Sequence, residues 1–337
     1  IKIIGDHTDM YAQAYFDYDS KKSGGVTISH LRFGKDPIKS TYLINKANFV
    51  ACHMPAYIRK YNMVQDLKDG GTFLLNTSWT LEELERELPG QVKKYIADHN
   101  INFYTIDGFK LGKEIGLGGR INTILQSAFF TLADIIPVDD AIKYMKDAAT
   151  ASYSKKGDEV VAMNHKAIEA GSNAFVKVEV PASWANAEAE DLTTTVTGDR
   201  EDLVKYVNTV QNAINSQTGN DLPVSAFVDY ADGSLPSGSA AYEKRGVAID
   251  VPSWNPDTCI QCNFCSYVCP HAAIRPVAMN EEQAANAPEG KVMDLTGMPG
   301  YKFAMSVSVL DCTGCGSCVN VCPGKKGEKA LEMKPID

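Results

Sequence analysis

Two cysteine runs near the end of the 337-residue chain constrain its fold more than any other feature. Residues 259–270 have the sequence Cys-Ile-Gln-Cys-Asn-Phe-Cys-Ser-Tyr-Val-Cys-Pro, and residues 312–323 have the sequence Cys-Thr-Gly-Cys-Gly-Ser-Cys-Val-Asn-Val-Cys-Pro. Both runs fit the pattern C-x2-C-x2-C-x3-C-P. Three cysteines with this spacing on a tight loop reach three corners of one [4Fe–4S] cube, and the fourth ligand then comes from the other run.

This crossed pattern is typical of bacterial two-cluster ferredoxins and predicts two [4Fe–4S] clusters. The ligands of one cluster would be Cys259, Cys262, Cys265 and Cys322, and those of the other would be Cys312, Cys315, Cys318 and Cys269. Pro270 and Pro323 suit a first helical turn, where no backbone donor is needed. Gly314 and Gly316 let backbone N–H groups approach the cluster sulfides.

Zinc sites and disulfides are the alternatives for these cysteines. A zinc site uses four ligands in paired C-x2-C units, which leaves the remaining cysteines and the repeated proline unexplained. Disulfides require an oxidising compartment and are typical of small secreted folds, whereas eight of the nine cysteines here lie in two metal-type runs. Clusters with thiolate ligands indicate a reducing compartment, so we expect the cytoplasm or, equally compatible, an anaerobic organelle.

Residues 1–190 have the pattern of an α/β domain. Short apolar runs rich in β-branched and aromatic residues predict strands at 15–19, 26–33, 48–53, 72–76 and 103–107. Amphipathic segments predict helices at 81–88, 121–136, 139–151 and 158–170. Strands that alternate with helices indicate a mostly parallel, doubly wound sheet. The chain opens without Met in the apolar Ile-Lys-Ile-Ile, so we expect this domain to be N-terminally incomplete and the chain to be a fragment or processed piece.

The rest of the chain divides into two further parts. Residues 191–245 are rich in Ala, Thr, Gly and Ser around one helix at 201–214, and we expect a connecting strap without a core of its own. Residues 246–337 hold both cysteine runs and are predicted to form a small α+β ferredoxin-like domain. Residues 280–300 exceed what a minimal ferredoxin needs and are expected to be an inserted excursion.

Charge and hydropathy exclude two classes of partner. The net charge of −9 argues against general nucleic-acid binding. No segment approaches the roughly 18 consecutive apolar residues of a membrane-spanning helix.

Two glycine-containing loops are candidate anion sites. Lys21, Lys22, Ser23 and Gly24 follow a predicted strand and could hold phosphates, although a solvated turn explains them as well. The second loop contains three candidate residues, Gly119, Arg120 and Asn122. It lacks the third glycine of the dinucleotide fingerprint but precedes a long helix, whose N-terminus suits an anionic ligand; the alternative is a plain loop with one exposed arginine.

Two further features each have a functional and a purely structural interpretation. Cys52 and His53 are adjacent in a predicted strand, where their side chains point to opposite faces, so a buried structural cysteine is favoured over a catalytic pair. The basic segment 325–329 directly follows the last run. It would either attract an acidic electron carrier or form a solvated loop.

The chain resembles pyruvate:ferredoxin (flavodoxin) oxidoreductases over essentially all of its length. The resemblance rests on segments of both parts of the chain: 5–13, 19–24, 26–34, 70–76, 118–123, 242–248, 259–263, 268–272 and 311–316. It implies that residues 1–190 form the γ-type domain that holds coenzyme A, with the 21–24 and 119–122 loops at its phosphates and adenosine end. It further implies that residues 246–337 relay electrons to an external ferredoxin or flavodoxin.

In this family the thiamine diphosphate, Mg²⁺ and a third [4Fe–4S] cluster belong to domains for which the chain shows no signature. The resemblance therefore implies the coenzyme-A-holding and relay section of an enzyme that converts pyruvate to acetyl-CoA and CO2, working with its remaining domains as a homodimer. The alternatives are a stand-alone iron–sulfur carrier or adaptor, and an oxidoreductase for another 2-oxoacid.

Overall fold

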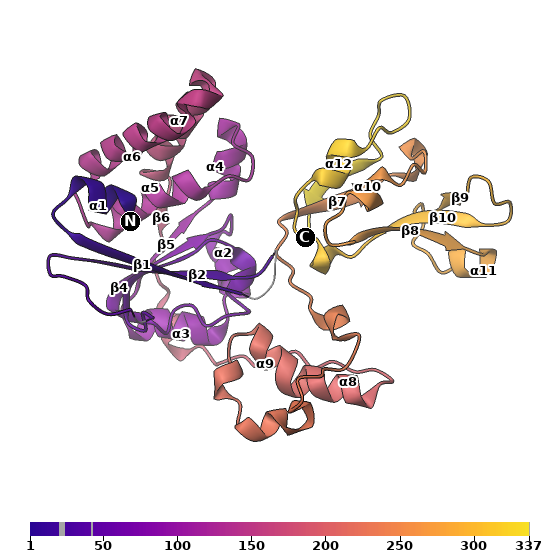
Figure 1. Cartoon of the computed structure of the whole chain (residues 1–337), viewed down its shortest axis with the longest axis horizontal. Coiled ribbons are helices and arrows are strands. Elements are labelled where there is room, and N and C mark those ends of the chain that lie inside the picture. Colours follow the sequence, from indigo (N-terminus) through magenta and orange to yellow (C-terminus); the bar gives the residue numbers. More distant parts are fainter. Residues whose placement is uncertain (20–23, 42, 337) are drawn as a thin grey trace. The chain divides into compact units, whose positions relative to one another are not determined.

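The computed structural model describes residues 1–19, 24–41 and 43–336. These residues form two compact units (Figure 1). The first contains residues 1–19 and 26–194, and the second contains residues 24–25 and 195–336. Within the described ranges, no helix has the length and apolar character needed to cross a membrane.

A four-stranded sheet forms the centre of the first unit. Its strands are β3 (Ala47–Cys52), β4 (Leu67–Asn76), β5 (Asn102–Ile106) and β6 (Val176–Lys177), in the order β3-β4-β5-β6. β3 and β5 run parallel to β4, whereas β6 pairs antiparallel to β5 at the edge.

Helices cover both faces of this sheet. The side chains of Phe73 and Leu75 pack on one face with α2 (Leu81–Glu87) and α3 (Gly90–Asp98). Leu74, between them in β4, packs on the other face with α5 (Asn122–Ala133) and α7 (Asp158–Gly171). Successive strand residues point to opposite faces, so the apolar run Phe73–Leu75 of β4 contributes side chains to both cores. The predicted doubly wound α/β class is confirmed.

Three more helices complete this unit: α1 (Lys2–His7), α4 (Gly108–Ile115) and α6 (Val138–Tyr153). α5 is a few residues shorter than the helix predicted at 121–136, and α6 is a few residues longer than the helix predicted at 139–151. α2 begins as predicted: the Thr80 side chain accepts from the Glu83 amide, and the Glu83 carboxylate accepts from the Thr80 amide. This reciprocal pair satisfies two donors at the helix start.

The first two predicted strands do not belong to the parallel sheet. β1 (Tyr11–Tyr18) and β2 (Thr27–Gly34) pair antiparallel as a separate hairpin, with Tyr15 opposite His30. The connection between them is too short for the crossover of a dozen or more residues that a parallel pair requires. The hairpin packs through Phe33, whose ring centroid lies 6.3 Å from that of Phe129 in α5.

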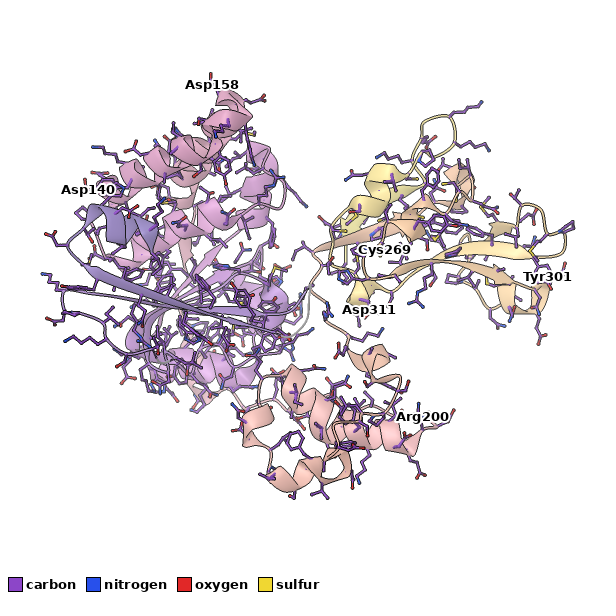
Figure 2. All side chains as sticks on the ribbon, in the orientation of Figure 1. Asp140, Asp158, Arg200, Cys269, Tyr301 and Asp311 are labelled. Atoms are coloured by element: carbon purple, nitrogen blue, oxygen red, sulfur yellow. The ribbon has the colours of Figure 1, made fainter. Side chains whose placement is uncertain are left out.

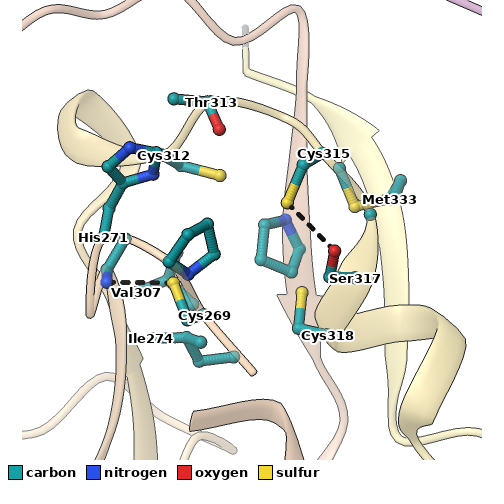
Figure 3. Close-up of a pocket in the computed structure, with 14 residues that line it drawn as sticks. Cys269, His271, Ile274, Val307, Cys312, Thr313, Cys315, Ser317, Cys318 and Met333 are labelled. Carbon is teal, nitrogen blue, oxygen red and sulfur yellow. Dashed lines mark hydrogen bonds between the residues drawn. The ribbon is translucent and has the colours of Figure 1, made fainter. Parts of the chain in front are cut away.

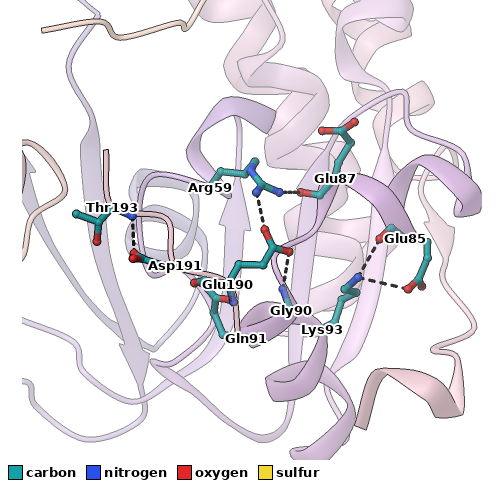
Figure 4. A network of polar contacts seen from close by, with 9 residues as sticks. All are labelled: Arg59, Glu85, Glu87, Gly90, Gln91, Lys93, Glu190, Asp191 and Thr193. Atoms are coloured by element: carbon teal, nitrogen blue, oxygen red, sulfur yellow. Dashed lines mark hydrogen bonds and ion pairs between the residues drawn. The ribbon is translucent and has the colours of Figure 1, made fainter. Parts of the chain in front are cut away.

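The segment around residues 185–191 is held on the surface of α3 (Figure 4). Glu190 accepts a hydrogen bond from Arg59 Nη2 at 2.6 Å and another from the Gly90 amide at 3.2 Å. The Gln91 side chain accepts from the Glu190 amide at 3.0 Å. The carboxylate lies at the N-terminal end of a helix, where its negative charge is favourable.

The expectation that residues 191–245 lack a core is wrong. α8 (Glu201–Tyr206), a π-helical turn (Val207–Gln211) and α9 (Asn212–Asn215) form one continuous helix. Its buried residues Leu203, Tyr206, Val207 and Val210 pack against the partly buried Val196, Tyr230 and Tyr242 of the surrounding loops. The apolar face of this single helix packs against aromatic residues of the loops. Composition alone did not reveal this packing.

The cysteine-rich domain has a repeated β-α-β plan. The first half is β7 (Asp250–Trp254), α10 (Phe264–Tyr267) and β8 (Ile274–Met279), and the second is β10 (Lys302–Val307), α12 (Ser317–Val321) and β11 (Leu331–Pro335). β7 pairs with β11, and β8 pairs with β10, so each two-stranded contact joins both halves. The predicted α+β ferredoxin-like domain is confirmed.

The excursion between the halves is ordered. It contains α11 (Glu281–Ala284) and β9 (Met293–Asp294), and β9 adds a third strand beside β10. Gln261 anchors it to the first cysteine run, since its side chain donates to the Asp294 carbonyl at 2.7 Å and accepts from the Thr296 amide at 2.9 Å. At the entrance to the domain, Lys244 Nζ lies 2.5 Å from Asp311 Oδ2. Figure 2 labels Asp311 and Cys269 within this domain.

Candidate iron–sulfur centres

The second cysteine run forms most of one pocket, here called the 312 pocket. Its lining includes Cys312, Cys315, Cys318 and, from the first run, Cys269. Figure 3 shows these four side chains around one interior, with Ile274 and Val307 on its apolar side. The structure thus brings together the four cysteines that the sequence grouped.

The first run forms the matching pocket, here called the 259 pocket. Its cysteines are Cys259, Cys262, Cys265 and, from the second run, Cys322. The helices α10 and α12 contain the third cysteine of each run and pack together, and Cys265 and Cys318 are both buried. Both helices end before the fourth cysteine, so Pro270 and Pro323 do not open a helix as the sequence suggested. Each run therefore contributes three sulfurs to one pocket and one sulfur to the other.

Left-handed backbone turns fold both runs around their pockets. Gln261 and Asn263 have φ values of 58° and 62°, and Gly314 and Gly316, at the equivalent positions, have φ values of 70° and 72°. Non-glycine residues rarely adopt this region, although asparagine tolerates it better than most. At Gly314 a side chain would also approach the Asp250 carbonyl oxygen to 3.1 Å. The two runs reach the same turn with different residues.

Backbone amides point at the sulfurs in both pockets. The four N–H···Sγ contacts are Gln261 to Cys259 at 3.4 Å, Gly314 to Cys312 at 3.4 Å, Ala273 to Cys269 at 3.2 Å, and Ala330 to Cys322 at 3.3 Å. They form two pairs related by the repeat. Such donors stabilise negative charge on a sulfur ligand.

Burial affects the thiols strongly. It raises the pKa of Cys265 to about 11 and also raises the pKa values of Cys312 and Cys318. At Cys315 burial again raises the pKa, but hydrogen bonds with Ser317 and its own backbone outweigh it and the net pKa falls. A bound metal takes the place of the thiol proton, which removes this cost of burying a thiolate.

The donor set fits a [4Fe–4S] cluster in each pocket. Four sulfurs surround each interior, as a cluster with one thiolate on each iron requires, and the amides described above lie ready to stabilise its charge. In the described ranges, no three His, Cys, Asp or Glu side chains form a group that could hold a single metal ion.

The predicted coenzyme A loops are only partly within the described ranges. Lys21, Lys22 and Ser23 lie outside them. Gly24, with φ 72°, lies in the second unit, and a Cβ there would come within 3.1 Å of Arg245 Nη1 and 3.3 Å of Thr313 Cγ2. It therefore neighbours the loop of the second cysteine run.

The other predicted loop belongs to the first unit. Gly119 and Arg120 are exposed, and Asn122 is the first residue of α5. Gly112 of α4 contacts this loop so closely that a Cβ would lie 2.5 Å from the Gly118 carbonyl oxygen. The loop thus packs closely against α4 and leaves Arg120 exposed at the surface.

Cys52 is a buried thiol, as the sequence suggested. Burial raises its pKa to about 12, and its Sγ lies 3.1 Å from the Met54 carbonyl oxygen. Burial also lowers the pKa of His53.

Sequence reasoning missed residues that line the 259 pocket, above all Trp254 and Met305. Trp254 precedes the first cysteine of its run by the same number of residues as Val307 precedes Cys312. Aligning the two runs beyond their cysteines would have drawn attention to this position.

Three protein-family models match successive parts of the chain. The model described as pyruvate ferredoxin/flavodoxin oxidoreductase matches residues 1–174, a domain of unknown function matches 191–248, and a 4Fe-4S dicluster domain matches 258–326. The last match agrees with the two pockets and identifies residues 258–326 as an iron–sulfur domain.

Curated relatives match over the whole chain. The chain is 52% identical to the pyruvate:ferredoxin oxidoreductase of Moorella thermoacetica and 49% identical to the pyruvate-flavodoxin oxidoreductase of Enterobacter agglomerans, in each case over 100% of this chain and 28% of the relative. It is 42% identical to the pyruvate dehydrogenase [NADP(+)] of Cryptosporidium parvum, over 100% of this chain and 18% of the relative. The chain thus spans less than a third of the length of these relatives. With a family model over residues 1–174 and a dicluster domain behind it, the chain belongs to the pyruvate ferredoxin/flavodoxin oxidoreductase family.

Proposed function

We propose that this chain is the coenzyme-A-holding and electron-relay section of an enzyme that oxidatively decarboxylates pyruvate to acetyl-CoA and CO2. The observation that carries the proposal is the sharing of both four-cysteine pockets between the two runs. In this division of labour residues 1–190 hold coenzyme A, residues 191–245 connect, and residues 246–337 relay electrons.

The relay depends on how the chain holds its clusters. Cys259, Cys262, Cys265 and Cys322 ligate one, and Cys312, Cys315, Cys318 and Cys269 ligate the other. Bound clusters supply one-electron transfer at low potential. The chain's own residues fix the sulfurs, donate N–H groups to four of them, and surround each pocket with apolar side chains such as Ile274 and Leu331.

Coenzyme A would be held by the two loops named above, Lys21, Lys22, Ser23 and Gly24 in one and Gly119, Arg120 and Asn122 in the other. The exposed Arg120 guanidinium just before α5 supports this assignment, because arginine forms paired hydrogen bonds with phosphate. Arg120→Ala should weaken coenzyme A binding about tenfold or more in calorimetry of the whole enzyme, with unchanged iron content. Arg86→Ala removes another surface guanidinium, on α2, and serves as the control. Equal affinity in the two variants would contradict the assignment.

The remaining parts of the reaction lie outside this chain. We infer that thiamine diphosphate, Mg²⁺ and a third [4Fe–4S] cluster belong to the rest of a longer, homodimeric polypeptide. Ferredoxin or flavodoxin is the proposed electron acceptor. Thiolate-ligated clusters suit a reducing compartment, and we place the enzyme in the cytoplasm or an anaerobic organelle.

The test uses the enzyme purified anaerobically from its natural source. Pyruvate together with coenzyme A should reduce the clusters, seen as loss of visible absorbance and appearance of electron paramagnetic resonance (EPR) signals, and omission of either substrate should greatly slow turnover. A polypeptide near 36.7 kDa that exchanges electrons without any 2-oxoacid would instead establish a stand-alone carrier. Reduction by a different 2-oxoacid but not by pyruvate would reassign the substrate.

A further inference from the structure

The 259 pocket contains buried polar groups that no protein atom satisfies. Three buried side-chain nitrogen or oxygen atoms in the described ranges lack a hydrogen-bond partner: His30 Nε2, Trp254 Nε1 and Asn263 Oδ1. Trp254 and Asn263 both line the 259 pocket. A buried donor without a partner destabilises the fold, and native proteins rarely leave one unpaired.

The Trp254 ring is held by its surroundings. The residue is 6% exposed and stands opposite Leu331 at the end of β7. Its ring packs edge-on against Phe303, with centroids 6.0 Å apart and planes at 69°. Lys291 Nζ donates to its backbone carbonyl at 3.0 Å. The apolar part of the indole and its main chain thus have partners, and the Nε1–H group remains.

The equivalent position of the other pocket has no donor. Val307 occupies it, lines the 312 pocket and stands opposite Ile274, just as Trp254 stands opposite Leu331. The repeat therefore places an indole beside one pocket and an aliphatic side chain beside the other. An aliphatic residue fills this position adequately, so packing alone does not require the tryptophan.

We propose that Trp254 Nε1–H donates a hydrogen bond to a sulfur of the cluster in the 259 pocket and raises the reduction potential of that cluster. The proposal rests on the proposed function, which places a cluster there. Reduction adds one electron, which increases the negative charge on the cluster and its thiolates. A hydrogen-bond donor stabilises that charge more strongly in the reduced state, so the donor favours reduction. Trp254 is a tuning residue rather than a ligand.

Trp254→Phe in the full-length enzyme isolates the N–H group, because phenylalanine retains an aromatic ring without a donor. An EPR-monitored redox titration should show one cluster shifted to lower potential and the other clusters unchanged. A tenfold change in the ratio of oxidised to reduced cluster corresponds to 59 mV for one electron, and we expect a shift of about this size. The matched control is Trp184→Phe, which removes the buried indole that donates to Glu85 in the α/β unit and should shift no cluster.

A second measurement needs no substitution. Enzyme labelled with ¹⁵N in its tryptophan indoles should show a ¹⁵N coupling to one reduced cluster in pulsed EPR. Absence of that coupling in the unsubstituted enzyme, or equal potentials in the Trp254→Phe and Trp184→Phe variants, would overturn this inference while leaving the clusters in place. Absence of any iron–sulfur signal would overturn the proposed function itself.

Discussion

The 312 pocket and the 259 pocket share one backbone plan but differ in the side chains around it. Beside the cysteines, the 312 pocket is lined by Thr313, Ser317 and His271. Counting along the repeat, the equivalent positions around the 259 pocket hold Ile260, Phe264 and Gly324. One pocket thus has hydroxyls near its sulfurs, with Cys315 Sγ 3.4 Å from Ser317 Oγ. The other is lined by the exposed apolar side chain of Ile260 and by the buried indole of Trp254.

The difference separates two tasks that the repeat performs. The positions that hold sulfurs and turn the backbone are equivalent in both halves, because any four-thiolate cluster needs them. The positions between them are free to differ, and they set the polarity around each sulfur, which is a main determinant of potential. Two similar pockets can therefore hold clusters of different reduction potential along one electron-transfer path.

The largest expected effect comes from removing one ligand of each pocket. Cys262→Ala should lose or convert the cluster of the 259 pocket, and Cys315→Ala should do the same in the 312 pocket. Iron analysis and EPR should show a different missing signal in each variant, while the α/β unit keeps its circular dichroism. Survival of every low-potential signal in Cys262→Ala would refute the ligand assignment.

Alanine should destabilise the domain by different amounts at the two residues that follow the Cys-Pro pairs, Gly324 and His271. Gly324 has φ 59°, and a Cβ there would lie 1.7 Å from the Glu328 carbonyl oxygen. Overpacking and backbone strain should destabilise the Gly324→Ala domain by about 3 kcal/mol, whereas His271→Ala should cost less than about 1 kcal/mol. Thermal loss of the visible cluster absorbance measures both variants. Equal transition temperatures would show that this loop relaxes.

The basic loop beside the 259 pocket provides a functional contrast. Lys325 and Lys326 follow Gly324, which lines that pocket, whereas the corresponding positions after His271 hold the uncharged Ala272 and Ala273. Replacing both lysines by glutamine should slow electron transfer to an acidic ferredoxin or flavodoxin about tenfold at low salt, because steering by opposite charge raises association rates. Rates with a small neutral dye provide the control. Equal slowing with the dye would indicate damage to the cluster instead of lost steering.

The smallest effect should come from the Ser317 hydroxyl. Ser317→Ala removes a hydroxyl near the exposed Cys315. It should lower the potential of the 312-pocket cluster by less than Trp254→Phe lowers that of the other, because solvent can reach the exposed Cys315 and replace the lost hydroxyl. A redox titration of the two variants side by side checks the order. A larger shift in Ser317→Ala would reverse the proposed ranking of surface and buried donors.

The cysteine spacing was sufficient to predict which four sulfurs meet in each pocket, because the local turns and the repeat determine it. The hairpin β1–β2 was missed because the apolar periodicity of Tyr15–Phe16 and Ile28–Leu31 identifies strands but not their partners. The core around Leu203 and Tyr206 was missed because it depends on loop residues far along the chain, such as Tyr230 and Tyr242. Trp254 was missed for a similar reason: an unsatisfied N–H is visible only after packing.

The shared pockets also affect how the domain is made. With the proposed ligands, the first run alone completes neither cluster. The cluster of the 259 pocket also needs Cys322, and the cluster that Cys269 ligates needs three cysteines of the second run. β7 likewise awaits β11 at the other end of the domain. Closing such long loops costs conformational entropy, and the binding of a cluster to both runs offsets that cost. Folding of this domain thus depends on the supply of iron. A cell starved of iron would accumulate chains whose cluster domain is open and protease-sensitive while the α/β unit is intact.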